Sequence, residues 1–269
     1  RYGERETDAK NRLAPTEDEL TIKSVVVVET PAASGTSMTG TPPEATSASV
    51  PRPSRAGLGG MRAMVAEQWD QALQAARSKL EPEGAITGAT RELQAGLGEF
   101  LKVCHEHGVK VGPWRLQHVV AEWTYGDHPT YGAISIAHWV CKDGQPWKVG
   151  IGLFLARGPA KSKDLQIKLS AMQAEPPMVD HLILLRPEDD LTLSGKSKTF
   201  WQEAERRGQH ARLEAVGIDG FAALYAIPRW LAALTEALPA GQALPNLADF
   251  VQEHCEKLLE QVCMPVQAG

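Results

Sequence analysis

The stretch Trp147-Lys-Val-Gly-Ile-Gly-Leu-Phe-Leu155 decides the fold of this chain. It is apolar at nearly every position, which is typical of a strand in the middle of a sheet that is covered on both faces. One face carries five large apolar side chains, namely Trp147, Val149, Ile151, Leu153 and Leu155. On the other face, Gly150 and Gly152 leave room for a helix to approach closely.

Further strands are predicted on both sides of this stretch. Alternating residues at 116–125 and 132–140 predict two strands before it, and turn signals at 126–129 and 142–145 make the three an antiparallel meander. A helix that begins at Ser162 leads to a short apolar strand at 181–185, and a helix over 196–207 leads to a strand at 211–216. We therefore predict an α/β fold. Its mixed central sheet has a three-strand antiparallel meander plus one or two parallel strands, with helices on both faces.

Other apolar patterns predict helices outside the sheet. Amphipathic spacing indicates one helix over 61–81 and a second over about 88–107. A helix that follows Asp219 is expected to end, kink or restart at Pro228. Asn246 is expected to open a last amphipathic helix.

The composition divides the chain into four segments. Residues 1–29 hold one isolated strand pattern, at 20–29, which indicates the remnant of a preceding domain or a strand that adds to a sheet edge. Residues 30–60 are dominated by Pro, Ala, Ser, Thr and Gly, which predicts a disordered linker. Residues 61–240 form the α/β domain, and 241–269 its C-terminal helix. The chain opens with Arg1 rather than Met, so we expect it to be part of a longer protein.

The composition, net charge and cysteine pattern exclude some classes of function. Of 269 residues, 43% are apolar and 23% charged, as in ordinary globular proteins. The net charge of −5 gives no global basic field, so any nucleic-acid contact has to come from a local patch. The four cysteines form no CxxC motif, which favours free thiols in a reducing compartment. Because no signal peptide or membrane-length apolar run is present, we expect a cytoplasmic protein that does not contact a membrane.

The order of elements over residues 88–216 resembles the core of the restriction-endonuclease-like superfamily. The resemblance implies an acid at the end of the second strand and Glu/Asp-x-Lys on the third, which hold a divalent metal that activates water. Here the third strand, at 147–155, contains no acid, and the nearest candidates are Glu122, Asp127, Asp143 and Lys148. The resemblance therefore implies a degenerate member that does not cut. Behind its low-complexity linker, the domain also resembles the C-terminal part of large bacterial multidomain proteins, including phage-defence ATPases.

Basic side chains follow two strands that are expected to be neighbours. The first set is Arg157, Lys161, Lys163 and Lys168, and the second is Lys196, Lys198, Arg206, Arg207 and Arg212. Because both sets come after carboxyl ends of strands, they could converge on one edge of the sheet, where helix N-termini also favour phosphate. The alternative is a solvated surface whose charge is balanced by Glu188, Asp189, Asp190, Glu203 and Glu205.

Three smaller patterns have plain structural explanations. The run Ser194-Gly-Lys-Ser197 lacks the glycine that a P-loop needs at position 190, so it indicates a turn and the start of a helix. His138 lies on the apolar face of its strand, which predicts a hydrogen-bonded core histidine. The aromatic side chains of Trp123, Tyr125 and Tyr131 surround one turn and could form an exposed platform for a partner.

These patterns lead us to expect a non-catalytic interaction module of a larger bacterial protein, with no cofactor. It would bind nucleic acid or a partner protein through a sheet edge and the two basic segments. One alternative is a divergent metal-dependent nuclease that uses Mg²⁺ with Glu122, Asp143 and Lys148. Another is a structural or oligomerisation domain that docks through the helix at 61–81. The partner stays open between DNA and another domain or subunit, as does the oligomeric state.

Overall fold

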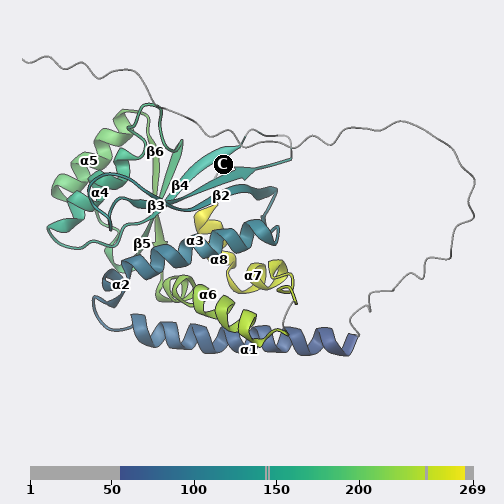
Figure 1. Cartoon of the computed structure of the whole chain (residues 1–269). Helices are drawn as coiled ribbons and strands as arrows, with labels where there is room; N and C mark the ends of the chain where they lie inside the picture. The colour runs from purple at the N-terminus through teal and green to yellow at the C-terminus, as the bar shows by residue number, and fades with distance from the viewer. Residues whose placement is uncertain (1–54, 143, 145, 240–241, 264–269) are drawn as a thin grey trace, which may run out of the picture. The chain divides into compact units, whose positions relative to one another are not determined.

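The computed structural model describes residues 55–142, 144, 146–239 and 242–263, with side chains from residue 59 onward (Figure 1). The predicted remnant at 1–29 and the linker residues 30–54 lie outside this description. Helix α1 spans Arg55–Leu80, so it begins six residues before the predicted start at Met61. Residues 55–60, which we had assigned to the linker, are its first turns, because extending a formed helix needs only one more hydrogen bond per residue.

The sheet is mixed, as predicted. The described residues form six strands in the order β1-β2-β3-β4-β5-β6. The first four pair antiparallel, and they are β1 Lys110–Val111, β2 Trp114–Thr124, β3 Ala133–Val140 and β4 Trp147–Leu153. The last two continue the sheet in parallel with β4, and they are β5 His181–Pro187 and β6 His210–Val216. The two-residue strand β1 was not predicted, since it is too short to show an alternating pattern.

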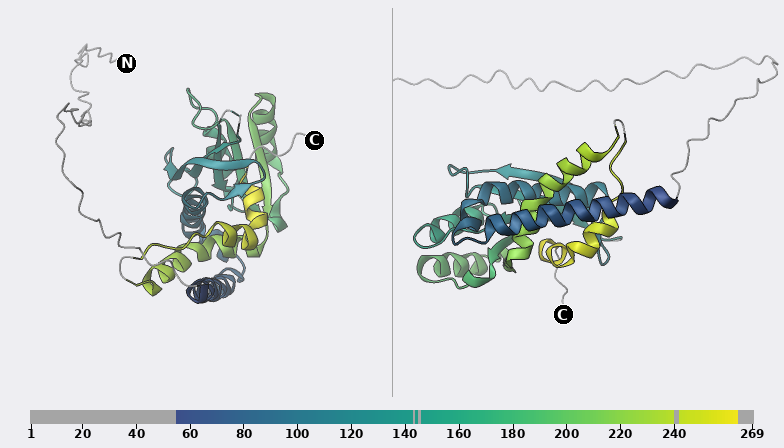
Figure 2. Two further views of the ribbon diagram at one scale, coloured as in Figure 1. Left: turned by 90° about the vertical axis from the view of Figure 1, so that its right-hand side faces the viewer. Right: turned by 90° about the horizontal axis from the view of Figure 1, so that it is seen from below.

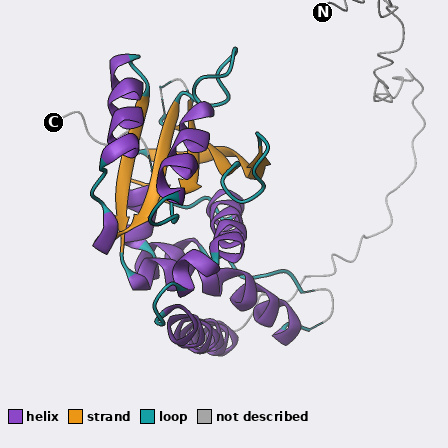
Figure 3. Cartoon of the chain, turned by 90° about the vertical axis from the view of Figure 1, so that its left-hand side faces the viewer, coloured by secondary structure: helices purple, strands orange, loops and turns teal. Residues whose placement is uncertain are grey.

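Helices cover both faces of the sheet (Figures 1 and 3). One face packs against α4 Ala160–Ser170 and α5 Gly195–Arg206, with a core that includes Ile134, Phe154 and Leu165. The other face packs against the remaining helices, which are α2 Ala85–Gly88, α3 Thr90–Glu106, α6 Ile218–Ala237, α7 Ala248–His254 and α8 Glu256–Val262, together with α1. In the part of the chain that the structure describes, no helix is both long enough and apolar enough to cross a bilayer.

The central strand β4 faces helices on both sides. Val149, Ile151 and Leu153 are buried in the larger core. On the opposite face, a Cβ atom added to Gly152 would lie 3.1 Å from the side chain of Lys168 on α4. The prediction that the glycines let a helix approach closely is confirmed at Gly152, where the group that approaches is a charged side chain, whereas Ile134 and Val179 fill the space over Gly150.

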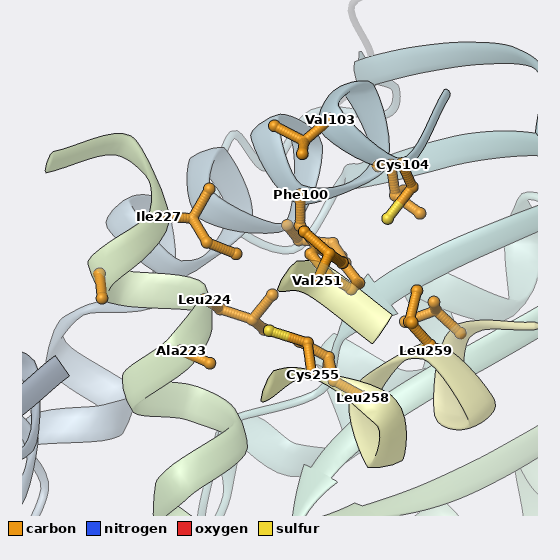
Figure 4. Packing of buried hydrophobic residues seen from close by; sticks show 14 of the residues in the cluster. Phe100, Val103, Cys104, Ala223, Leu224, Ile227, Val251, Cys255, Leu258 and Leu259 are labelled. Atoms are coloured by element: carbon orange, nitrogen blue, oxygen red, sulfur yellow. The ribbon is translucent and has the colours of Figure 1, made fainter. Parts of the chain in front are cut away.

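Of the three outcomes that we predicted at Pro228, an end and a restart are excluded, because helix α6 continues through this residue. Proline has no N–H to donate to the carbonyl four residues earlier, which belongs to Leu224. A Cβ atom added to Gly96 of α3 would lie 1.9 Å from this carbonyl oxygen, so the two helix backbones touch there. The contact between α3 and α6 thus covers the carbonyl that Pro228 leaves without its helical partner, and the surrounding core holds the helix together (Figure 4).

The amphipathic face of α1 is buried within the same unit. α1 runs along α6 (Figure 2), the rings of Trp69 and Trp230 lie 5.1 Å apart, and Trp230 Nε1 donates to the carbonyl of Val65. An oligomerisation domain that docks through this helix would need an exposed apolar face, and the structure covers that face with α6.

The predicted last helix is divided in two. α7 ends at His254 and α8 begins at Glu256, with Cys255 between them at φ −125°. Val251, Cys255 and Leu259 recur at intervals of four residues, and all three reach the core beside α3 and α6 (Figure 4). The N–H of Cys255 donates to the carbonyl of Val251 and the N–H of Leu259 to that of Cys255, so the buried face continues across the division.

Candidate functional site

The helices α4 and α5 begin at the same edge of the sheet. Strands β4 and β5 are parallel neighbours, so the chain leaves both at their carboxyl ends. The two connections touch, because Lys161 Nζ donates to Asp190 Oδ1 and to the carbonyl of Thr192, each at 2.7 Å. We call this region the α4–α5 end and define it as residues 156–164 and 188–198. The expected convergence of the two segments is found here.

A pocket of about 320 Å³ opens between the two helix starts. It is lined by Gly158, Pro159, Lys161, Ser162, Ser194, Lys196 and Ser197. Neither helix has an acidic residue in its first turn, and neither has a side chain that caps its N-terminus. The first N–H groups of a helix have no partner within it and carry partial positive charge. The pocket therefore has the electrostatic character of an anion site.

Ser197 adds a side-chain donor to this pocket. It is only 3% exposed, yet its hydroxyl has no hydrogen-bond partner among the described residues. The oxygen itself is not fully buried, because it borders the pocket, and it can donate to a group there. Lys196, the preceding residue, is exposed and has no ion-pair partner in the part of the chain described.

Helix α4 also carries a buried ion pair, between Asp164 and Lys168. The two side chains are 2% and 1% exposed, and their closest charged atoms are 3.7 Å apart. Asp164 Oδ2 accepts a hydrogen bond from the backbone N–H of Ala156, and Lys168 Nζ donates to the carbonyl of Tyr131. Burial raises the pKa of Asp164 to about 6, although Lys168 opposes the shift. Burial lowers the pKa of Lys168, and Asp164 opposes that change.

The buried side chain of Arg186 links the segment that follows β4 to the segment that follows β5. Its guanidinium is fully buried, lies 4.0 Å from the centre of the Phe154 ring, and donates to the carbonyls of Phe154 and Ala156. It also pairs with Asp190. Burial would raise the pKa of Asp190, but hydrogen bonds and charge from Lys161 and Arg186 outweigh it and lower that pKa. These bonds fix both connections, so the pocket is already formed in the free protein.

The predicted basic residues fall into three groups. Arg157 and Lys161 are ion-paired, with Asp189 at 2.8 Å and with Asp190 at 2.7 Å. Lys168 is buried, and we were wrong to expect it on the surface. Lys163, Lys196 and Lys198 are exposed, without ion-pair partners among the residues described. These three lysines are the available charges of the α4–α5 end.

The remaining basic residues lie elsewhere. Arg206 and Arg207 are at the other end of α5, about 16 Å from its start along the helix axis. Arg207 pairs with Glu203. Arg212 pairs with Glu214 at 2.9 Å, and it donates to the carbonyls of Gln261 and Cys263. The alternative to a phosphate-binding surface was that acids balance these basic side chains. That alternative holds for Arg157, Lys161, Arg207 and Arg212.

The three candidate nuclease residues are not brought together where the structure describes them. Asp143 lies outside the described residues. Lys148 pairs across the sheet with His138, whereas Glu122 lies on β2 between the partners of Ile136 and Ile134. That places Glu122 about 10 Å from Lys148 along the strands. Among the described residues, no three His, Cys, Asp or Glu side chains are grouped so that they could hold a metal ion.

The aromatic platform is smaller than predicted. Trp123 is 45% exposed, but Tyr125 is half-buried and donates to the carbonyl of Lys168 at 3.3 Å. Tyr131 stacks on His128 with ring centres 3.9 Å apart. His138 is not a core residue, because it is only half-buried, and its ring lies 5.4 Å from that of its cross-strand partner His118 on β2.

Some residues of the site were missed from the sequence. Arg186 follows the four apolar residues 182–185, and we ended the strand before it at 185, whereas β5 continues to Pro187. Asp164 was not considered, although its spacing of four from Lys168 on a helix is that of an ion pair. The arrangement as a whole can bind an anion. Comparison of the chain with protein-family models, curated proteins and solved structures finds no match.

Proposed function

We propose that this domain is a non-catalytic interaction module that binds the phosphate backbone of DNA through the α4–α5 end. The observation that carries the proposal is the group of three exposed lysines without ion pairs in the described structure, Lys163, Lys196 and Lys198. They lie on the first turns of two helices that begin side by side. Phosphate groups are the usual ligands of such a combination of lysines and helix N-termini.

The acids of the same region do not cancel this charge. Asp189 is held by Arg157, and Asp190 by both Lys161 and Arg186. Asp164 is buried against Lys168. Glu188, which is exposed and has no ion pair among the described residues, offsets one of the three free lysines. The other two leave the α4–α5 end positive, although the chain as a whole carries −5. A local field of this kind is sufficient for binding that depends strongly on salt.

The proposal is one of binding without cleavage. Strand β4 has no acid at the position where the nuclease pattern needs one, and Glu122 lies away from Lys148. As the resemblance implied, we place the module in a larger bacterial protein of the defence type, in the cytoplasm. In that setting the module would hold DNA while another part of the protein acts on it.

The test is fluorescence anisotropy with the full chain and a labelled 20-base-pair DNA duplex. We expect binding at 50 mM salt that weakens steeply towards 200 mM. The variant K163E/K196E/K198E should lose affinity at least about tenfold, and its salt slope should fall by about 2 to 3, since each phosphate contact contributes about 0.9.

A matched control makes the same charge change elsewhere. In R62E/K79E/R206E, two exposed residues of α1 and one at the far end of α5 are reversed. This variant should bind nearly as well as the unmodified chain. The proposal fails if no salt-dependent binding exists at 50 mM, or if the control loses as much affinity as K163E/K196E/K198E.

A further inference from the structure

The pocket between α4 and α5 is more than a charged surface. Its volume of about 320 Å³ is roughly ten times the share of one water molecule in the liquid. Its walls come from two helix starts and combine the small residues Gly158, Pro159, Ser162, Ser194 and Ser197 with Lys161 and Lys196. A group that enters it therefore meets donors that are already in place.

Two glycines in the left-handed conformation lie where the helices α4 and α5 begin. Gly158 has φ +58° just before α4, and Gly195 has φ +52° where α5 begins. Glycine adopts this left-handed conformation without the steric cost that other residues have. Each glycine turns the chain abruptly from its strand connection into a helix, so that both helix starts border the same space.

The donors in the pocket are independent of one another. They are N–H groups at the starts of two helices, the ammonium of Lys196, and the hydroxyl of Ser197, a residue that is only 3% exposed. The hydroxyl is the observation that points to a ligand, because this nearly buried side chain lines the pocket and has no acceptor among the described residues. Here no described group satisfies it.

From this arrangement we propose that the pocket binds a phosphomonoester, specifically the terminal 5′-phosphate of a DNA strand. The inference rests on the proposed function and names the part of the DNA that this pocket takes. A terminal phosphate has three free oxygens and up to two charges, whereas a backbone phosphate has two free oxygens and one charge. Two helix N-termini, a lysine and a hydroxyl suit the terminal group better, because donors reach it from two sides.

The experiment compares two versions of the 20-base-pair duplex with the full chain, one with 5′-phosphates and one with 5′-hydroxyls. We expect the phosphorylated duplex to bind about tenfold more tightly, the gain from one or two hydrogen bonds to a charged group. Ser197→Ala should reduce this preference to less than about threefold. Lys196→Gln, a change at an exposed position that cannot disturb the core, should reduce it as well.

The control is Ser170→Ala at the other end of α4, where the hydroxyl donates to the carbonyl of Ile167 at 2.7 Å. This variant should keep the full preference for the phosphorylated duplex. Equal affinity for both duplexes overturns the terminal-phosphate site and leaves the proposed function standing. Absence of binding to both at 50 mM salt overturns the proposed function and the site with it.

Discussion

Replacing Lys168 by methionine tests the buried ion pair that supports the α4–α5 end. Methionine has nearly the same length and keeps the packing against Gly152, but it removes the charge that faces Asp164. Removing one partner of a buried pair typically costs 3–5 kcal/mol, because the other charge is left without compensation. We expect a loss of about this size in the free energy of unfolding at pH 8.

The loss should depend on pH, and its sign follows from Asp164. Burial raises the pKa of this carboxyl from 3.8 to about 6, so the folded state takes up a proton that the unfolded state does not hold between these values. The free energy of unfolding therefore falls as pH rises through this interval, by about 3 kcal/mol. Without Lys168, the pKa of Asp164 rises further and the fall extends to higher pH. At pH 5 the carboxyl of Asp164 is already protonated. The stability that Lys168→Met loses should therefore shrink to about 1 kcal/mol, which is the contribution of the hydrogen bond from Lys168 to the carbonyl of Tyr131.

The assay is urea unfolding followed by tryptophan fluorescence at pH 5 and pH 8. The double variant D164N/K168M should recover to within about 1.5 kcal/mol of the unmodified chain, since the asparagine still accepts from Ala156 and no buried charge remains. Lys163→Met, a change of the same kind at an exposed position of α4, should alter stability by less than about 0.5 kcal/mol. The reasoning is refuted if D164N/K168M is as unstable as K168M at pH 8, or if the loss in K168M is the same at both pH values.

Two further predictions concern the packing of the larger core. Gly96→Ala should destabilise the fold by at least about 3 kcal/mol in urea unfolding, because the new Cβ would lie 1.9 Å from the carbonyl oxygen of Leu224. Gly88→Ala, with nothing within 4 Å, should be neutral or slightly stabilising, and equal losses in both would contradict the close helix contact. With a thiol reagent at pH 8, only the half-buried Cys141 should react promptly, and Cys141→Ser should abolish the fast phase. The other thiols are buried, and burial raises the pKa of each, to about 12 for Cys255 and Cys263. A fast phase that corresponds to more than one thiol would contradict this prediction.

Much of the sheet was determined by the sequence alone, because its signals are local. An apolar run with glycines on one face predicts a central strand whatever lies beside it, and β4 has the faces expected of it. Since the carboxyl ends of parallel strands lie on one edge, the sequence also predicted that the segments after β4 and β5 meet. The central sheet and the location of the candidate site both follow from these patterns.

Only the tertiary structure decided which side chains at that edge are free. Lys168 and Lys163 look alike in the sequence, but the space over Gly152 takes one of them into the core beside Asp164. Pro228 is a helix breaker by its own chemistry, and only the contact of Gly96 with the carbonyl of Leu224 shows how α6 contains it. In each case the outcome depends on a partner far away in the chain, and no local pattern carries that information.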